Sequence, residues 1–286
     1  MNILETKNLE KVYDAFSLRD INLEVKSGEI TALVGENGAG KSTTIGCLSG
    51  IKKKSGGKIL FKGKDMDSLS REERSEIAFA YDEISFPLEF TVSQVGKYGS
   101  ILYSNWDEGK WLNLLTKLSL PKDRKLKELS KGMKAKTEIA YSLSHDPSLL
   151  ILDETTSSLD PVVRDELMDL FQSFVEDGEK AILFSSHITS DLEKIADRII
   201  FIHKGRLILS IDRNELDEKW ALVHAEKDSG WEKEKEVEHF RVRPYSMDLL
   251  VSDISSFLSR HPEAQREKAD IETILLMVAR GEEEGL

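Results

Sequence analysis

Gly35-Glu36-Asn37-Gly38-Ala39-Gly40-Lys41-Ser42 is a complete G-x-x-x-x-G-K-[ST] loop, the pattern of a phosphate-binding loop. It follows the apolar run Ile30–Val34, which predicts a buried strand, and it opens a predicted helix over residues 42–48. Glycines let backbone N–H groups close around phosphate oxygens, and the helix N-terminus adds positive partial charge. Lys41 is placed to reach the β- and γ-phosphates, and the Ser42 hydroxyl to ligate Mg²⁺. The stretch therefore predicts an α/β protein that binds a nucleoside triphosphate.

Composition narrows the class of protein. The 286 residues carry a formal net charge of −12, and the pI is about 5.1, which argues against nucleic-acid binding through phosphate neutralisation. Lys52-Lys53-Lys54 could form a local basic patch, or simply a solvated loop. No run of eighteen apolar residues predicts a membrane span, and residues 1–5 show no signal-peptide core. A single cysteine, Cys47, excludes an internal disulfide, so we expect a cytoplasmic protein.

The flanking segments predict an α/β core with two additions. Residues 3–34 predict an antiparallel strand region, with Ile21, Leu23 and Val25 alternating with polar neighbours. Short strands at 58–62 and 77–81 enclose a predicted helix at 69–76. Residues 91–145 turn helical, with a loop at 121–123, which predicts two long helical stretches inserted into the core.

A second apolar run, Leu149-Leu150-Ile151-Leu152, has the composition of a parallel strand buried on both faces. It ends in Asp153-Glu154. In a phosphate-loop protein, Asp153 at this strand end fits the acidic partner of Mg²⁺. The adjacent Glu154 is placed to act as general base on an attacking water.

The next strand also ends in polar residues. A helix is predicted over residues 161–175, followed by a buried strand at 181–184 that ends in Ser185-Ser186-His187. His187 stands at the carboxyl end of an apolar strand, the edge where open α/β sheets bind ligands. The alternative is a structural or merely exposed histidine. Residues 198–203 and 206–211 predict a hairpin.

The pattern of predicted elements changes after residue 212. Strands are predicted at 219–225 and 237–242, and helices at 246–260 and 269–279. This segment contains no chemical motif. We expect residues 1–212 to form the catalytic domain, and residues 213–286 a small α+β appendage for dimer or partner contacts.

Taken together, these motifs resemble the nucleotide-binding subunit of an ATP-binding cassette (ABC) transporter over about residues 1–212. Leu129-Ser130-Lys131-Gly132-Met133 stands where that family's signature, usually Leu-Ser-Gly-Gly-Gln, belongs. The resemblance implies a RecA-like phosphate-loop core. It also implies that Tyr13 stacks on adenine and that ATP is bound by Gly35, Asn37, Gly38, Gly40, Lys41, Ser42 and Thr43. Mg²⁺ would be held by Ser42, Asp82 and Asp153, and the catalytic residues would be Glu154 and His187. The partner's ATP would be contacted by Ser130, Lys131 and Gly132, and Asp160 would lie in the loop that crosses between subunits. Taken alone, Tyr13 would suit packing at a strand end better than adenine stacking.

The resemblance also implies a working cycle and partners. Two cassettes, identical or different, dimerise head to tail and trap two ATP molecules, each between one phosphate loop and the other signature. ATP binding closes the dimer, and hydrolysis opens it. Transmembrane permease subunits on separate chains convert that cycle into transport, which places the chain on the cytoplasmic face of the cell membrane.

The sequence departs from the family pattern at several positions. Asp82 stands where a glutamine is expected, and it could still ligate Mg²⁺ at the cost of extra negative charge. Lys131 replaces the first signature glycine; its ammonium either lies near the trans phosphates or faces solvent. Met133 replaces the signature glutamine, and Thr155 the usual proline. Because the base Glu154, the histidine His187 and the signature serine Ser130 are all present, we expect an active ATPase.

The motifs are shared with two other classes of function besides a transport motor. DNA-repair and chromosome-organising ATPases share these motifs but carry a long coiled coil between them, whereas only about 85 residues separate Ser42 from Leu129. A regulatory ATPase without a membrane partner is the other alternative. The loop after Tyr81 and the C-terminal segment favour a resemblance to bacterial exporters of peptides or antibiotics, with no nucleic-acid partner expected.

Overall fold

The computed structural model describes residues 1–157, 159–186 and 188–280. Its centre is a six-stranded sheet in the order β11-β10-β4-β9-β8-β7. Neighbouring strands run parallel except β10 and β11, which form the predicted hairpin. The strands are β4 (Ile30–Val34), β7 (Ile77–Tyr81), β8 (Leu149–Asp153), β9 (Ala181–Ser185), β10 (Arg198–His203) and β11 (Arg206–Asp212). Parallel order brings the carboxyl ends of β4, β7, β8 and β9 to one edge.

Both faces of this sheet are buried, which explains its unbroken apolar runs. Leu150 and Leu152 of β8 belong to one apolar cluster, while Leu149 and Ile151 belong to another. The first cluster includes side chains of α5 (Lys131–Leu143) and α6 (Pro161–Val175), and the second includes those of α1 (Lys41–Leu48). The phosphate-loop helix and the signature helix therefore cover opposite faces of one sheet.

The predicted antiparallel region is present. β1 (Asn2–Val12) pairs with β2 (Ser17–Ile21), β3 (Glu24–Lys26) and β5 (Gly56–Phe61), and β5 pairs with β6 (Lys64–Asp65). Ile21, Leu23 and Val25 are buried as predicted, but they do not lie on one strand. The Thr6 hydroxyl donates to the Ile21 carbonyl at 2.6 Å and accepts from the Leu23 N–H at 2.8 Å, which explains the interruption.

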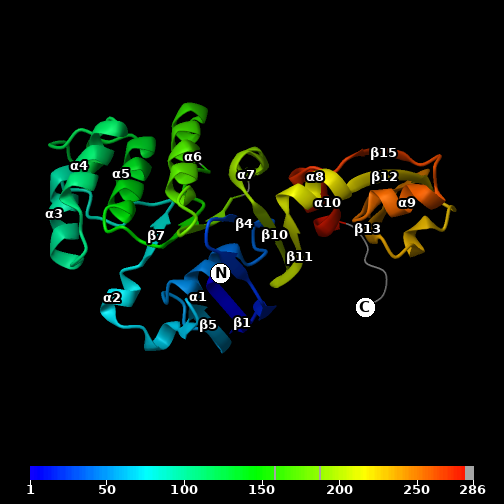
Figure 1. Cartoon of the computed structure of the whole chain (residues 1–286), viewed down its shortest axis with the longest axis horizontal. Helices are drawn as coiled ribbons and strands as arrows, with labels where there is room; N and C mark the ends of the chain where they lie inside the picture. The colour runs from blue at the N-terminus through cyan, green and yellow to red at the C-terminus, as the bar shows by residue number, and fades with distance from the viewer. Residues whose placement is uncertain (158, 187, 281–286) are drawn as a thin grey trace.

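The helical insertion has three helices rather than two long stretches. They are α3 (Val92–Leu102), α4 (Glu108–Lys117) and α5, with a short 3₁₀ turn, η2 (Leu126–Glu128), before α5. The side chain of Asp107 caps α4 at the unpredicted break. The helix expected at 69–76 is also shorter: Ser70 caps α2 (Arg71–Arg74), which follows the 3₁₀ turn η1 (Met66–Ser68). Figure 1 shows α3, α4 and α5 standing beside α6 at one end of the molecule.

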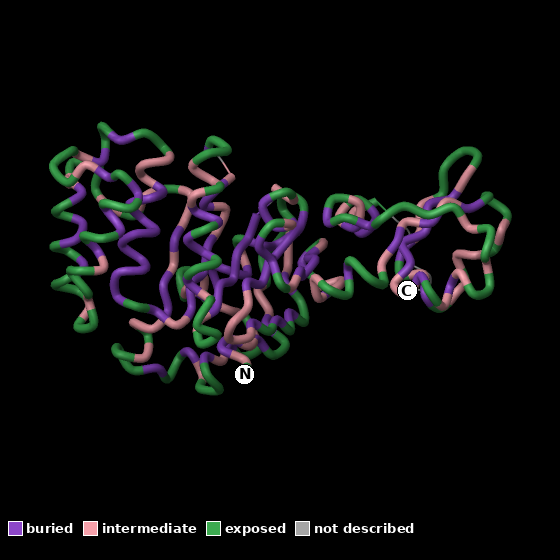
Figure 2. The backbone as a smooth tube through the Cα atoms, turned by 45° about the horizontal axis from the view of Figure 1, so that its top comes forward, coloured by how far each residue is buried: buried purple, intermediate pink, exposed green. Residues whose placement is uncertain are grey.

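The C-terminal region forms a third sheet in the order β13-β14-β12-β15, all antiparallel. The helix predicted over 246–260 is wrong in its first half, which is the strand β14. The helices and strands of this region are α8 (Arg213–Lys219), β12 (Ala221–Glu226), η3 (Trp231–Lys233), β13 (Val237–Val242), β14 (Ser246–Val251), α9 (Ile254–Arg260), β15 (Gln265–Lys268) and α10 (Ile271–Arg280). A further helix, α7 (Thr189–Ile195), lies between β9 and β10 in the chain. α10 packs back against β10 and α7, and Ile274 and Met277 belong to a buried cluster that includes residues of the central sheet. Figure 2 shows buried positions, in purple, both in the larger part of the molecule and in the C-terminal region.

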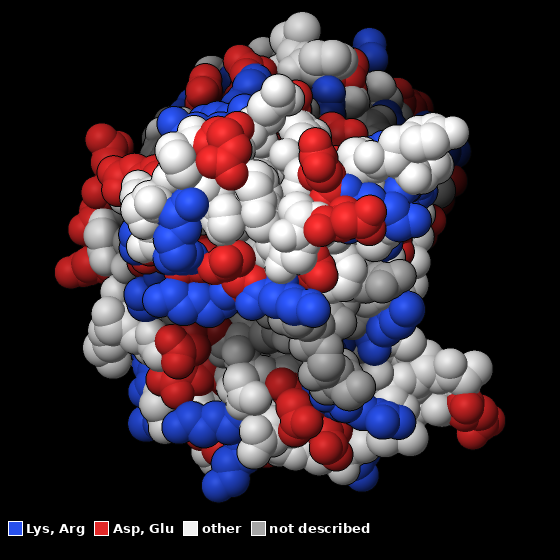
Figure 3. Space-filling model, turned by 90° about the vertical axis from the view of Figure 1, so that its right-hand side faces the viewer, with Lys and Arg blue, Asp and Glu red and all other residues white. Residues whose placement is uncertain are grey.

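Charge is well mixed on the face that the C-terminal region presents. Acidic and basic side chains are interspersed there and do not separate into patches of one sign (Figure 3). Among the described residues, no helix is long and apolar enough to cross a membrane.

Candidate active site

The motif residues meet because four neighbouring strands end together. Ser185, the last residue of β9, pairs with Leu33 of β4 on one side and with Asp153 of β8 on the other. Asp153 in turn pairs with Tyr81, the last residue of β7. The phosphate loop, Asp153 and the loop that begins at Asp82 therefore leave one edge of the sheet, where open α/β sheets bind ligands.

Lys41 is almost fully buried within the phosphate loop. Its Nζ atom donates to the Gly35 carbonyl at 2.8 Å and to the Glu36 carbonyl at 3.4 Å. Gly35 permits close passage of β10, because a Cβ there would lie 2.4 Å from the Ile202 carbonyl oxygen. Gly40 has φ of +120°, a conformation that side chains disfavour. The sequence thus shapes a backbone cradle around a buried ammonium, as a triphosphate requires.

Oxygen ligands for a hard cation lie beside this cradle. Asp153 Oδ1 accepts from Ser185 Oγ at 2.7 Å and from Ser42 Oγ at 3.2 Å. Burial raises the pKa of Asp153, whereas the two serine hydroxyls lower it. Among the described residues no group of three or more acidic, histidine or cysteine side chains forms a closed metal cage. One carboxylate and one hydroxyl fit Mg²⁺, which takes its remaining ligands from phosphate and water.

Glu154 is held in an uncommon backbone conformation, with φ of +55°. Its N–H donates to the carbonyl and the hydroxyl of Ser185, at 3.1 and 3.2 Å, and this anchors the turn. The carboxylate lies 3.4 Å from Lys41 Nζ and accepts from Ser157 Oγ at 2.5 Å. A carboxylate beside the phosphate-loop lysine is suitably placed to take a proton from a water near the phosphates.

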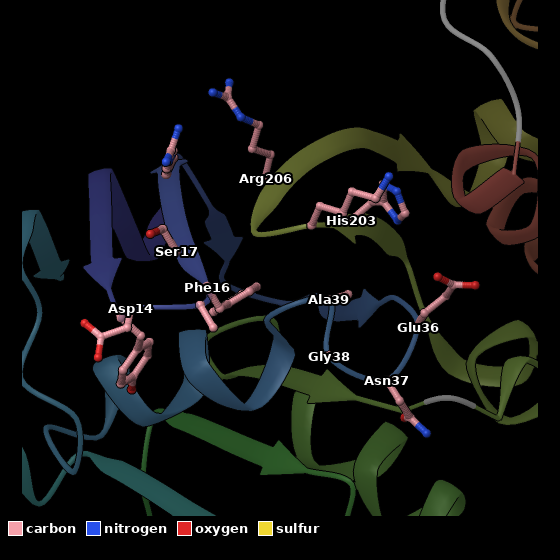
Figure 4. Close-up of a pocket in the computed structure, with 13 residues that line it drawn as sticks. Asp14, Phe16, Ser17, Glu36, Asn37, Gly38, Ala39, His203 and Arg206 are labelled. Atoms are coloured by element: carbon pink, nitrogen blue, oxygen red, sulfur yellow. The ribbon is translucent and has the colours of Figure 1, made fainter.

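A cavity of about 560 Å³ adjoins the outer side of the phosphate loop (Figure 4). Tyr13, Asn37 and Gly38 line it together with the hairpin residues His203 and Arg206. The structure thus places Tyr13 beside the phosphate loop despite some twenty residues of separation, as adenine stacking requires. Thr43, in the first turn of α1, is half-buried.

The signature residues and Asp160 form a second group, at the N-termini of α5 and α6. Ser130 caps α5 by accepting from the Met133 N–H at 3.2 Å. Asp160 caps α6 by accepting from two N–H groups of its first turn, each at 3.1 Å. A Cβ on Gly132 would lie 3.4 Å from Val163 of α6, so the two helix ends lie side by side.

Two further predicted positions need separate description. Lys131, the first residue of α5, contacts Asp82 through an ion pair of 3.1 Å. His187, the predicted catalytic histidine, lies outside the described residues. Sequence reasoning missed Ser185, which holds both Asp153 and the Glu154 backbone, and Ser157, which contacts the Glu154 carboxylate. The sequence does contain a signal for Ser185: it ends a buried strand, and the preceding buried strand ends in an acid, Asp153.

The chain is similar to known ATP-binding subunits of transporters. The family model described as ABC transporter matches residues 18–157. The lantibiotic transport ATP-binding protein SrtF of Streptococcus pyogenes is 37% identical over 210 residues, which cover 72% of this chain and 90% of that protein. The bacitracin transport ATP-binding protein BcrA of Bacillus licheniformis is 31% identical over 220 residues, covering 76% and 72%.

Solved structures show the same fold. An ATP-binding subunit of an ABC transporter superposes with a TM-score of 0.68 at 28% identity, covering 75% of this chain and 91% of that one. cbiO1 of Clostridium perfringens, part of the ABC transporter complex cbiONQ, gives 0.64 at 30% identity, covering 75% and 90%. The predicted phosphate-loop α/β fold is confirmed.

Proposed function

The chain belongs to the ABC transporter family of ATP-binding subunits, and from this premise we propose that it drives export of peptides or small hydrophobic antimicrobial compounds. It is an ATPase and the motor subunit of a transporter. The names of SrtF and BcrA, which transport a lantibiotic and bacitracin, support the choice of cargo class. The observation that carries the proposal is the strand edge where Lys41, Asp153 and Glu154 converge.

The contacts at this edge support a division of labour in hydrolysis. The Lys41 ammonium and the loop N–H groups bind the β- and γ-phosphates, and Glu154 accepts the proton of the attacking water. Asp153 and Ser42 would hold Mg²⁺, which neutralises charge that develops on the phosphates. Ser185 keeps both acids in place through its hydroxyl and carbonyl. Tyr13 stacks on the adenine ring at the neighbouring cavity.

A second cassette completes the site in this proposal. Ser130, Lys131 and Gly132 open α5, and Asp160 opens α6, so this group is suited to an anion brought by a partner. The arrangement supports a head-to-tail dimer in which each chain offers its signature to the other's ATP. Two identical cassettes and two related cassettes both satisfy this geometry.

The membrane partner is proposed to dock beside α3. Large apolar side chains are exposed there, notably Ile101, which is 73% exposed, together with Leu88, Tyr98 and Leu102. Burial of such a surface would favour association with an apolar intracellular segment of a transmembrane subunit. We therefore place the chain at the cytoplasmic face of the membrane. The net charge of −12 favours no nucleic-acid partner.

Co-purification tests this proposal. A tagged Glu154→Gln chain is recovered with ATP from gently solubilised membranes, and bound proteins are identified by mass spectrometry. The expected result is a multi-span membrane protein in stoichiometric amount, and an Ile101→Asp variant should reduce that yield. Recovery only from the soluble fraction, alone or with nucleic acid, would contradict a transport role while leaving the ATPase site intact.

A further inference from the structure

The two charged departures from the family pattern meet in space. Asp82 Oδ2 lies 3.1 Å from Lys131 Nζ, although 49 residues separate them in sequence. The side chains are 39% and 51% exposed, so each has room to point elsewhere. Asp82 replaces the family's glutamine, and Lys131 replaces its glycine. The two usual residues carry no charge, so they could not form this ion pair.

Other contacts attach the same helix to the same segment. Glu138 of α5 is buried and accepts from the hydroxyl and the N–H of Ser85, at 2.7 and 3.2 Å. Ser142 of α5 donates to the Phe79 carbonyl in β7 at 3.1 Å. α5 therefore follows β7 and its outgoing loop along three of its turns, and the Asp82–Lys131 pair is the contact nearest the signature.

The electrostatics of the helix end favour this pairing. A lysine at the first position of α5 lies at the positive end of the helix dipole, which disfavours its charge. The first turn of α5 holds no acidic residue of its own. The Asp82 carboxylate supplies the missing negative charge. Pairing therefore offsets the positive charge of Lys131 at the helix N-terminus and the negative charge of Asp82 near the phosphates.

We propose that Asp82 and Lys131 act as one positioning unit, an ion pair that ties the loop leaving β7 to the first turn of the signature helix. Asp82 is then a positioning residue and not a Mg²⁺ ligand. The pair gives a direct route from the nucleotide edge, where β7 ends beside Asp153, to the residues that face a partner's ATP. The proposal concerns the same site as the proposed function, but it is tested on the nucleotide-free chain, so each can fail separately.

Hydrogen exchange on the full chain without nucleotide provides the test. Asp82→Asn and Lys131→Met are each expected to speed exchange over residues 82–90 by about two- to fivefold, the range for an exposed ion pair. The double variant is expected to match either single variant, because one interaction has been removed. The charge-swapped Asp82→Lys/Lys131→Asp chain should restore slow exchange. Lys194→Met breaks an ion pair of similar exposure with Asp165 and should leave residues 82–90 unchanged.

A second readout separates positioning from metal binding. For a positioning unit, Asp82→Asn and Lys131→Met lower kcat by a similar factor and leave the Mg²⁺ concentration for half-maximal activity unchanged. A raised Mg²⁺ requirement in Asp82→Asn alone would overturn the proposal in favour of a metal ligand. Unchanged exchange in Lys131→Met, or additive effects in the double variant, would also overturn it.

Discussion

The nucleotide edge and the C-terminal region both bury charged side chains, but they satisfy them differently. At the edge, Lys41 meets Glu154 at 3.4 Å, and Asp153 meets Ser42 at 3.2 Å. In the C-terminal region, the buried Asp248 accepts from Arg243 at 2.5 Å and contacts His224 at 2.9 Å. The edge acids contact serine hydroxyls and one lysine that converge on one place, whereas the C-terminal acid contacts an arginine and a histidine.

This difference separates a binding site from a structural network. Charge-assisted bonds from a guanidinium hold a buried acid firmly, as Arg260 also does for the buried Glu236. Groups that must bind phosphate and metal need partners that they can exchange, and the serine hydroxyls around Asp153 and the backbone carbonyls around Lys41 are such partners. The C-terminal region lacks this feature in its described residues, so we interpret its buried charges as structural.

The largest expected effect is on catalysis. Glu154→Gln keeps the shape of the side chain but removes the base, so ATP turnover should fall by at least about 100-fold while ATP binding persists. Phosphate release and binding of a fluorescent ATP analogue measure the two quantities. Asp228→Asn, an exposed change in the C-terminal region, is the control. Near-normal phosphate release by Glu154→Gln would contradict the interpretation of the nucleotide edge as the catalytic region.

Asp248→Ala tests the other side of the comparison. It leaves the partly exposed Arg243 and His224 without their buried acid, and losing these contacts to a charged group costs about 3 kcal/mol. Thermal unfolding should reveal this loss, while ATP turnover per folded chain stays near that of the unchanged protein. Asp248→Asn retains hydrogen bonding and should lose less stability. Lost turnover in a chain that remains folded would show that the network serves catalysis.

His145 extends the structural pattern to the helical insertion. Burial lowers its pKa to about 4 from an ordinary 6.5, and its Nδ1 contacts the Ser75 carbonyl at 2.8 Å. The unfolded chain binds more protons over this interval, so stability present above pH 6.5 is lost as pH falls to 4, by about 3 kcal/mol. Denaturant unfolding from pH 7 to 4 measures the loss. His145→Gln should flatten that dependence, and an unchanged slope would contradict it.

The smallest expected effect is at Ser185, which sequence reasoning missed. Ser185→Ala removes the hydroxyl that reaches Asp153 and the Glu154 N–H, while the backbone carbonyl still holds Glu154. Each of the two lost bonds is worth about 1 kcal/mol, so turnover should fall by about 30-fold. Steady-state kinetics measure this change, with Ser173→Ala on α6 as the control. An effect as large as that of Glu154→Gln would make Ser185 part of the chemistry.

The same comparison explains what the sequence could predict. At the nucleotide edge, local signals coincide: buried runs end in Lys41's loop and in Asp153, and parallel pairing then brings those ends together without further information. In the C-terminal region, β14 lies between two strands and is buried along five successive residues, so it shows no alternation. Its Leu249 and Leu250, followed by Ile254 and Phe257, resemble helical spacing, which explains the wrong helix.

Contacts between distant segments were the other limit. The resemblance marked Asp82 and Lys131 as separate departures, and only the packing of α5 on β7 shows that they meet. The break of β2 and β3 likewise depends on Thr6, a residue in another strand. Sequence patterns indicate which face is buried, but these pairings depend on three-dimensional register.

In the proposed dimer each chain holds half of the site, and ATP joins the two halves. Sedimentation velocity on the Glu154→Gln chain, with and without ATP and Mg²⁺, measures this association. We expect a monomer without ATP and a dimer with two bound ATP molecules, and Ser130→Arg should prevent that dimer. A monomer that binds ATP tightly and never associates, or a dimer indifferent to ATP, would rule out a site shared between two chains.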